Sequence, residues 1–298
     1  MATLYQQIAE NKRRSWVMMT AVLVFVISAV GLYSWYVRGD FSLPIIAALF
    51  AIPSSLIGYY SGDKIALATN RAQEVSRDAA PELHRIIENL SIASGTPKPK
   101  LYVINSPALN AFATGRDPEH ASIAVTTGLI ERLDRSELEG VLAHELSHVR
   151  NYDIRFATMA AVFVGFITIL SDLFLRATFW GGGRSRDNRE SNGQLGAILA
   201  VVGLVLLIVS PIVTKLIQLA ISRQREYLAD ASGAMITRYP EGLARALEKI
   251  AQSAPLETAG KATAHLYIAN PFKGDNWTQW LATHPPIKDR VKRLRGLG

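Results

Sequence analysis

Five consecutive residues carry the strongest chemical signal in this chain of 298 residues. His144-Glu145-Leu146-Ser147-His148 forms an H-E-x-x-H motif. Residues four apart on a helix share a face, so both imidazoles can bind one tetrahedral zinc ion. Glu145 lies about 100° around the helix from His144, where its carboxylate can reach a water on the metal. The motif predicts a zinc centre with a general base, and the alternative is two histidines that meet by accident on an amphipathic helix.

The residues around this motif predict the helix that it needs. Asp134 is placed to cap a helix N-terminus, and Glu137, three residues later, completes a capping box. The apolar residues that follow repeat at helical spacing, namely Leu138, Val141, Leu142 and Val149. We therefore expect both histidines to lie on one helix that begins close to Asp134.

A third ligand is expected in the segment from Arg223 to Asp230. Glu226 and Asp230 are four residues apart and share a helix face, which Gly233 would allow to pack closely against another helix. We expect Glu226 to be the third metal ligand and Asp230 to hydrogen-bond a zinc-bound imidazole. The alternative is a solvated charged face with Arg–Glu pairs.

Composition narrows the class of protein. The chain has no cysteine, which excludes a disulfide scaffold, a cysteine-ligated zinc finger and a thiol nucleophile. Hydrophobic residues make up 49% and charged residues 19%, and the mean hydropathy of +0.15 averages apolar and polar parts. The net charge of +7 is dispersed along the chain, so no nucleic-acid partner is expected.

Four apolar stretches indicate a membrane protein. They cover residues 16–37, 43–60, 156–179 and 195–222, and we interpret them as four transmembrane helices. Lys12, Arg13 and Arg14 precede the first stretch and predict a cytoplasmic N-terminus. The arginines of the loop 181–193 argue for the opposite orientation.

These stretches divide the chain into four parts. Residues 1–60 form an N-terminal membrane hairpin, and residues 155–222 form a second hairpin with a loop at 181–194. Residues 61–154 carry the H-E-x-x-H helix, and residues 223–298 carry the third ligand. The two polar parts together have a typical domain size, so we expect one cytoplasmic catalytic domain with its zinc just above the membrane surface.

Several motifs resemble one protein family. The segment Asn110–Gly115, the H-E-x-x-H motif with Asn151 and Asp153 after it, and the segment Arg223–Asp230 resemble the HtpX group of membrane-bound zinc metalloproteases. This group is a bacterial relative of the CAAX prenyl endoproteases. The similarity runs from the first apolar stretch to His284-Pro285-Pro286 and Arg290, nearly the whole chain.

The resemblance implies a role for each matching residue. His144, His148 and Glu226 would bind one zinc ion per chain, and Glu145 would be the general base. His284 and Arg290 would lie near the substrate carbonyl. The implied fold is mainly α with a small β-sheet: a gluzincin-like cytoplasmic catalytic domain on a multi-pass protein of the bacterial cytoplasmic (inner) membrane.

Asn110 and Phe112 are further candidates for substrate binding. They stand before Ser122–Thr126, a short strand of alternating pattern. In a zincin-like cleft, the exposed edge of such a strand can pair with an extended peptide. The alternative is an ordinary edge strand.

The sequence therefore predicts a membrane-anchored zinc endopeptidase. Its expected substrates are peptides or the cytoplasmic segments of membrane proteins, especially damaged or misfolded ones, which implies a role in protein quality control under stress. Two other classes stay open. A metal transporter would need ligands within the spans, where Asp172 and Lys215 are the candidates. A non-catalytic membrane scaffold would have no need of Glu145.

Overall fold

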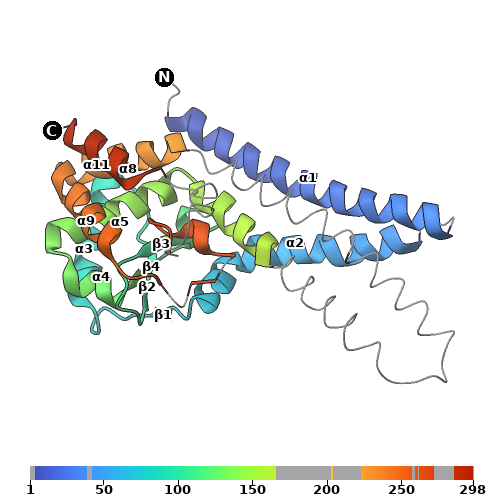
Figure 1. The fold of residues 1–298 in the computed structure, drawn as a ribbon, viewed down its shortest axis with the longest axis horizontal. Coiled ribbons are helices and arrows are strands. Elements are labelled where there is room, and N and C mark those ends of the chain that lie inside the picture. Colours follow the sequence, from blue (N-terminus) through green and yellow to red (C-terminus); the bar gives the residue numbers. More distant parts are fainter. Residues whose placement is uncertain are drawn as a thin grey trace.

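The computed structural model describes residues 4–38, 42–165, 203, 223–256, 259–260, 262–271 and 285–297. Two long helices, α1 (Leu4–Arg38) and α2 (Ser42–Thr69), run side by side and extend away from a mixed domain that contains the other elements (Figure 1). The rings of Trp16 and Tyr59 lie 5.6 Å apart between the two helices. The N-terminal end of α1 lies beside the mixed domain, near α8, and the rest of the helix extends away from it (Figure 1).

The predicted membrane spans are not confirmed. In the described parts of the chain, no helix has both the length and the apolar character that crossing a membrane needs. The first two predicted spans fall on α1 and α2. Residues 166–179 of the third and nearly all of the fourth lie outside the described residues, as does the loop 181–193.

A small mixed sheet supports the rest of the domain. Its strands are β1 (Gln73–Glu74), β2 (Lys100–Ile104), β3 (Ala111–Gly115) and β4 (Ala121–Thr126), in the spatial order β1-β2-β4-β3. β4 pairs in parallel with β2 and antiparallel with β3. The prediction that the strand Ser122–Thr126 offers an exposed edge is wrong, because neighbours pair with both of its sides. Strand β3 lies next to β4 and forms that edge of the sheet.

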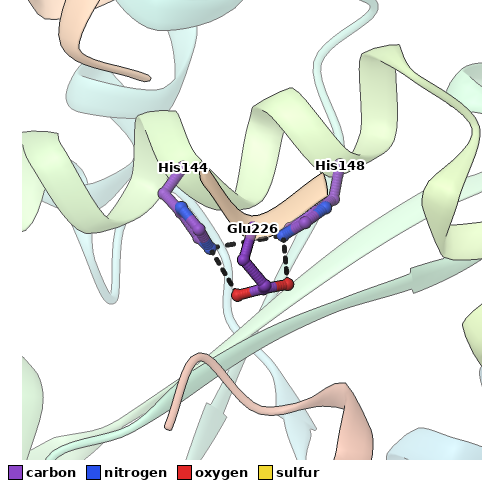
Figure 2. Close-up of side chains that lie close together, drawn as sticks. All are labelled: His144, His148 and Glu226. Atoms are coloured by element: carbon purple, nitrogen blue, oxygen red, sulfur yellow. Dashed lines mark hydrogen bonds and ion pairs between the residues drawn. The ribbon is translucent and has the colours of Figure 1, made fainter. Parts of the chain in front are cut away.

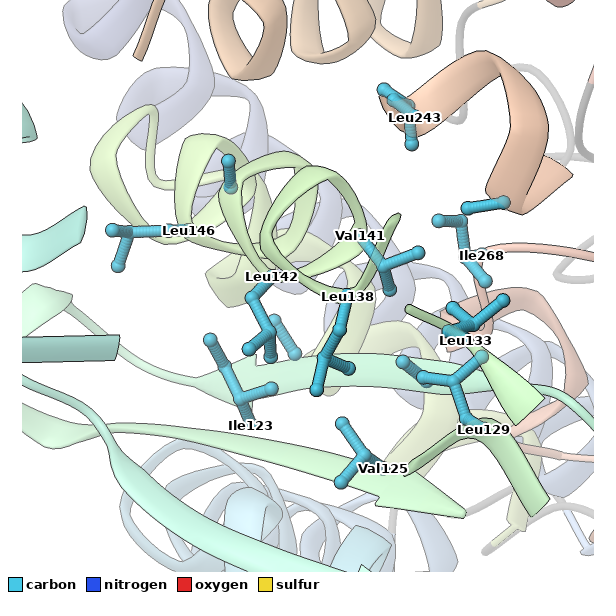
Figure 3. Close-up of a cluster of buried hydrophobic side chains, with 14 of the residues drawn as sticks. Ile123, Val125, Leu129, Leu133, Leu138, Val141, Leu142, Leu146, Leu243 and Ile268 are labelled. Atoms are coloured by element: carbon cyan, nitrogen blue, oxygen red, sulfur yellow. The ribbon is translucent and has the colours of Figure 1, made fainter. Parts of the chain in front are cut away.

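Helix α5 (Arg135–Arg150) lies between the sheet and helices α8 (Arg223–Thr237) and α9 (Pro240–Gln252). Figure 3 shows the core beneath it, where Leu138 and Leu142 of α5 face Ile123 and Val125 of β4. Three further helices in the described part of the domain are α3 (Pro81–Ser94), α4 (Thr127–Arg132) and α11 (Ile287–Arg295). The confirmed fold is thus mainly helical with a small mixed sheet.

The predicted capping box begins α5. The Asp134 carboxylate accepts a hydrogen bond from the Glu137 backbone N–H at 2.9 Å, and the Glu137 carboxylate accepts one from the Asp134 backbone N–H at 2.8 Å. These two bonds satisfy backbone donors that a helix start otherwise leaves without partners. The helix that carries H-E-x-x-H therefore begins where the sequence predicts.

A second helical segment, residues 153–165, follows α5 after a tight turn. Tyr152 in this turn has a φ of 60°, in the left-handed region that side chains other than glycine rarely adopt. The segment packs closely on α2. A Cβ added at Gly62 of α2 would lie 2.8 Å from the Thr158 side chain. The turn and the segment bring Asp153, Ile154 and Phe156 to the side of the motif histidines.

Candidate active site

The three predicted metal ligands converge on one point. His144 and His148 lie one turn apart on α5, and Glu226 reaches them from the first turn of α8 (Figure 2). The two Nε2 atoms are 3.2 Å apart, Glu226 Oε1 is 3.5 Å from His148 Nε2, and Glu226 Oε2 is 3.9 Å from His144 Nε2. Among the described residues, these three are the group whose ligand atoms could hold a metal ion.

The spacing of these atoms fits a tetrahedral metal centre. Ligand atoms bound about 2.1 Å from a tetrahedral zinc ion lie about 3.4 Å from one another. The three measured separations surround that value. Two imidazole nitrogens and a carboxylate oxygen are also the donor set of catalytic zinc sites that keep one position open.

Asp230 and Arg290 position the imidazole ring of His144. Asp230 Oδ1 lies 2.9 Å from His144 Nδ1, the nitrogen that faces away from the ligand cluster. Arg290 of α11 is fully buried and donates to both Asp230 oxygens, at 2.8 and 2.6 Å, and to the Ile268 carbonyl. The predicted bond between Asp230 and a ligand imidazole is therefore present in this structure.

Burial and charge set the protonation of this group. Burial and the Arg290 charge lower the pKa of His144 to about 4. Although burial opposes it, the charge and hydrogen bonds of Arg290 lower the pKa of Asp230 to about 2. His144 is therefore neutral and Asp230 ionised near pH 7, the protonation states in which imidazole binds a metal and carboxylate accepts its N–H.

His148 has an equivalent partner that the sequence analysis did not assign. Asp153 Oδ2 lies 3.0 Å from His148 Nδ1. Although desolvation opposes it, this hydrogen bond and the Glu226 charge raise the pKa of His148 to about 9. The only signal in the sequence was the position of Asp153, five residues after His148, in a segment that resembled the family.

Glu145 lies beside the ligand cluster without being part of it. Its side chain is 1% exposed, and its Oε1 atom has no hydrogen-bond partner among the described residues. Burial raises the pKa of this carboxyl to about 7. A desolvated carboxylate with a free oxygen next to a metal site is suited to accepting a proton.

A small pocket opens from this cluster. His144, Glu145, His148 and Glu226 line it, together with Ala113 of β3 and the mainly apolar residues Ile154, Phe156, Leu266 and Tyr267. The segment after the short helix η3 (Ala264–Leu266) forms one wall, and the Ile268 N–H donates to the Ala111 carbonyl of β3 at 2.9 Å. This segment therefore already occupies part of the β3 edge.

The predicted substrate-binding residues lie around the pocket but do not line it. Asn110 is buried and donates to the Ala269 carbonyl, and the buried Phe112 ring packs against Tyr267. Arg290, expected near the substrate carbonyl, is buried against the ligand residues: its Nη2 lies 3.4 Å from the His144 ring nitrogens, and its Nη1 lies 3.7 Å from Glu226 Oε2. His284 falls outside the described residues. The substrate contacts of these residues stay predictions.

Two histidines on one helix, a carboxylate from a second helix and a buried glutamate beside them define a metalloprotease centre. The sequence profile of peptidase family M48 matches residues 77–297, and the chain belongs to this family. It is a metalloprotease, as the motif predicts.

Named relatives agree with this assignment. The chain is 47% identical over 296 residues to a protease HtpX homolog of Caldanaerobacter subterraneus subsp. tengcongensis, covering 99% of this chain and 98% of the relative. It is 42% identical over 294 residues to one of Ligilactobacillus salivarius, covering 98% and 99%. The resemblance to the HtpX group is confirmed. Among solved structures, Ste24p of S. mikatae aligns with a TM-score of 0.49 and 18% identity, over 97% of this chain and 67% of that chain.

Proposed function

We propose that the chain is a zinc endopeptidase that is anchored in the bacterial cytoplasmic membrane. In this proposal it cleaves exposed segments of membrane proteins on the cytoplasmic side. The observation that carries the proposal is the convergence of His144, His148 and Glu226 next to the buried, unpaired Oε1 of Glu145. One zinc ion per chain satisfies this ligand set, and no nucleic acid takes part.

The chemistry divides between the metal and the side chains. A zinc ion at this site would supply a Lewis acid that polarises a peptide carbonyl and acidifies water. His144, His148 and Glu226 hold that ion, while Asp230 and Asp153 orient the two imidazoles. Glu145 accepts a proton from the attacking water at Oε1 and delivers it to the departing amine. His284 and Arg290 would assist at the carbonyl, as their motif positions indicate.

The surface of α1 and α2 supports a membrane location. Large apolar side chains are exposed along both helices, including Trp16, Val24 and Trp35 on α1 and Ile45, Leu49 and Leu56 on α2. Many exposed apolar side chains of this size are unfavourable in water and are covered by lipid in membrane proteins. Lys12, Arg13 and Arg14 at the start of α1 favour a cytoplasmic catalytic domain. In this proposal, residues 155–222 form the second of two hairpins, which gives four spans.

The pocket supports peptide substrates. The pocket is small and its surface is mainly apolar, so an unfolded segment enters it more readily than a folded domain does. Damaged or misfolded membrane proteins expose such segments, which is the basis for a quality-control role. A metal transporter is less well supported, because the ligand cluster of His144, His148 and Glu226 lies in a chain that belongs to a peptidase family.

The test uses two variants of the purified full-length protein. Glu145→Gln should keep zinc but lose cleavage of casein, because the amide cannot accept the proton. His144→Ala should lose zinc, measured by elemental analysis, together with activity. Cleavage by the Glu145→Gln variant at the rate of the unmodified protein would refute the proposed mechanism. Zinc uptake into proteoliposomes without any proteolysis would favour the transporter.

A further inference from the structure

A buried asparagine on α1 contacts the turn that follows the metal-binding helix. Asn11 is 6% exposed, and its Nδ2 donates to the Asn151 carbonyl at 2.9 Å and to Asp153 Oδ1 at 2.8 Å. Asn151 caps the C-terminus of α5, and Asp153 begins the next helical segment. One amide group therefore bridges both ends of this turn from a helix 140 residues earlier in the chain.

The turn needs support because its middle residue is strained. Tyr152 has a φ of 60°, a conformation that is unfavourable for a residue with a side chain. Lys12, the neighbour of Asn11, places its Nζ 4.1 Å from the centre of the Tyr152 ring. Two consecutive residues of α1 thus contact all three residues of the turn.

The contact extends to the metal ligands through a shared carboxylate. Asp153 Oδ2 faces His148 Nδ1 at 3.0 Å, while Oδ1 receives Asn11 Nδ2 and lies 3.4 Å from Arg225 Nη1. Arg225 Nη1 is also 3.4 Å from Asn11 Oδ1, and Arg225 directly precedes the ligand Glu226. Asn11 therefore contacts the hydrogen-bond partner of one ligand and the chain neighbour of another.

We propose that Asn11 is a positioning residue of the metal centre, so that α1 forms part of the active site as well as an anchor. Asn11 fixes the rotamer of Asp153, and Asp153 fixes the ring of His148. The inference rests on the proposed function, because it requires a metal at the site. Asn11 lies outside residues 77–297, the part of the chain that matches the peptidase family.

The test measures zinc affinity in the full-length protein carrying Glu145→Gln, which prevents self-cleavage. Asn11→Asp keeps the size of the side chain but removes its two donated bonds and places a second carboxylate against Asp153. Partners of metal-bound histidines typically contribute 10–100-fold in affinity, so we expect zinc to bind about tenfold more weakly, measured by competition with a chelator. Asn11→Ala should have a smaller effect, because it adds no charge.

A matched control and a rescue complete the design. Glu10→Gln changes a neighbouring α1 residue that pairs with Arg14 at the surface, and it should leave zinc affinity unchanged. Adding Asp153→Asn to Asn11→Asp restores a hydrogen bond between residues 11 and 153 in the reverse direction, and it should recover part of the affinity. The unfolding temperature of each metal-free variant separates a positioning effect from a loss of folding, because positioning weakens zinc binding by more than the loss of stability accounts for.

The outcomes are distinct. Unchanged zinc affinity in Asn11→Asp, or a loss fully matched by a lower metal-free unfolding temperature, would overturn the role of Asn11 alone. If the protein with Asn11 intact binds no zinc, the proposed function fails and this inference fails with it. Weaker binding in Asn11→Asp, partial recovery in the double variant and no change in Glu10→Gln would establish the role.

Discussion

Arg290 shows how much charge the site buries. Its guanidinium is 0% exposed, yet it lies beside two carboxylates, with bonds to Asp230 and a distance of 3.7 Å to Glu226. Burying three ionised groups is costly unless each has an oppositely charged partner. The charge of Asp230 keeps the pKa of Arg290 above its ordinary value despite burial, so this cation is permanent.

Removing that cation should destabilise the domain strongly. Arg290→Met leaves Asp230 buried without the cation that compensates its charge, which typically costs about 3–5 kcal/mol. Arg290→Lys keeps the charge but not the planar pair of bonds to Asp230. The stability of this variant should therefore lie between that of Arg290→Met and that of the unmodified protein. Urea denaturation of the metal-free protein measures the stability of both variants. Equal unfolding midpoints for the three proteins would contradict this account.

The sequence predicted the ligands because helix geometry relates them locally. His144 and His148 are four apart, as are Glu226 and Asp230, and such spacing fixes a shared face without knowledge of the fold. Local spacing does not relate the ligands to hydrogen-bond partners that lie across a turn or on another element. Asp153 received no role because the left-handed residue Tyr152 precedes it. The contact of Arg290 with Asp230 was not predicted, because no local pattern relates residues that are 60 positions apart.

At the scale of elements, the site depends on the close approach of α8 to α5. A Cβ added at Gly233 of α8 would lie 3.0 Å from the His144 backbone nitrogen. Gly140, on another face of α5, meets α9 similarly, because its added Cβ would lie 2.7 Å from the Leu243 nitrogen. The sequence suggested close packing at Gly233, and the structure confirms it.

These two glycines give a matched pair of variants. Gly233→Ala and Gly140→Ala should each destabilise the domain by about 1–3 kcal/mol, because the methyl group presses on backbone that cannot move aside. Only Gly233→Ala should also weaken zinc binding, because it displaces α8 and with it Glu226. Denaturation and chelator competition measure the two effects. Equal zinc affinities in the two variants would show that the α5–α8 distance does not control the site.

The capping box tests whether the start of α5 matters for catalysis. Asp134→Ala should lower the free energy of unfolding by about 1 kcal/mol, because the Glu137 N–H loses its acceptor. Asp134→Ser should restore most of that loss. Casein cleavage should be unchanged in both, since more than two helical turns separate Asp134 from His144. A large loss of activity at normal stability would instead place this end of α5 in the mechanism.

The prediction of an exposed edge at Ser122–Thr126 is wrong because strand pairing, unlike the spacing of the metal ligands, is not determined by local sequence. Residues 122–126 have the alternating pattern of a strand, and they form one. Alternation, however, says which side chains share a face and nothing about which strands are neighbours. The parallel partner of β4 is β2, some twenty residues earlier, and that pairing depends on the tertiary fold.

At the scale of the whole molecule, a metal held by these three ligands would join two distant parts of the chain. The histidines belong to α5 and the third ligand belongs to α8, on the two sides of residues 166–222. Removing zinc with a chelator should therefore lower the unfolding temperature, and adding zinc should restore it. At a concentration about 100 times the dissociation constant, zinc should add about 2.7 kcal/mol. Differential scanning calorimetry checks this, and His144→Ala should show no response.

The order of the ligands along the chain also sets when proteolysis can begin during synthesis. Glu226 lies 78 residues after His148, and Arg290, which donates to Asp230, lies 64 residues after Glu226. A nascent chain therefore has both motif histidines long before it has a complete metal site. Peptide cleavage therefore cannot begin until α8 and α11 have been synthesised and α8 has packed against α5.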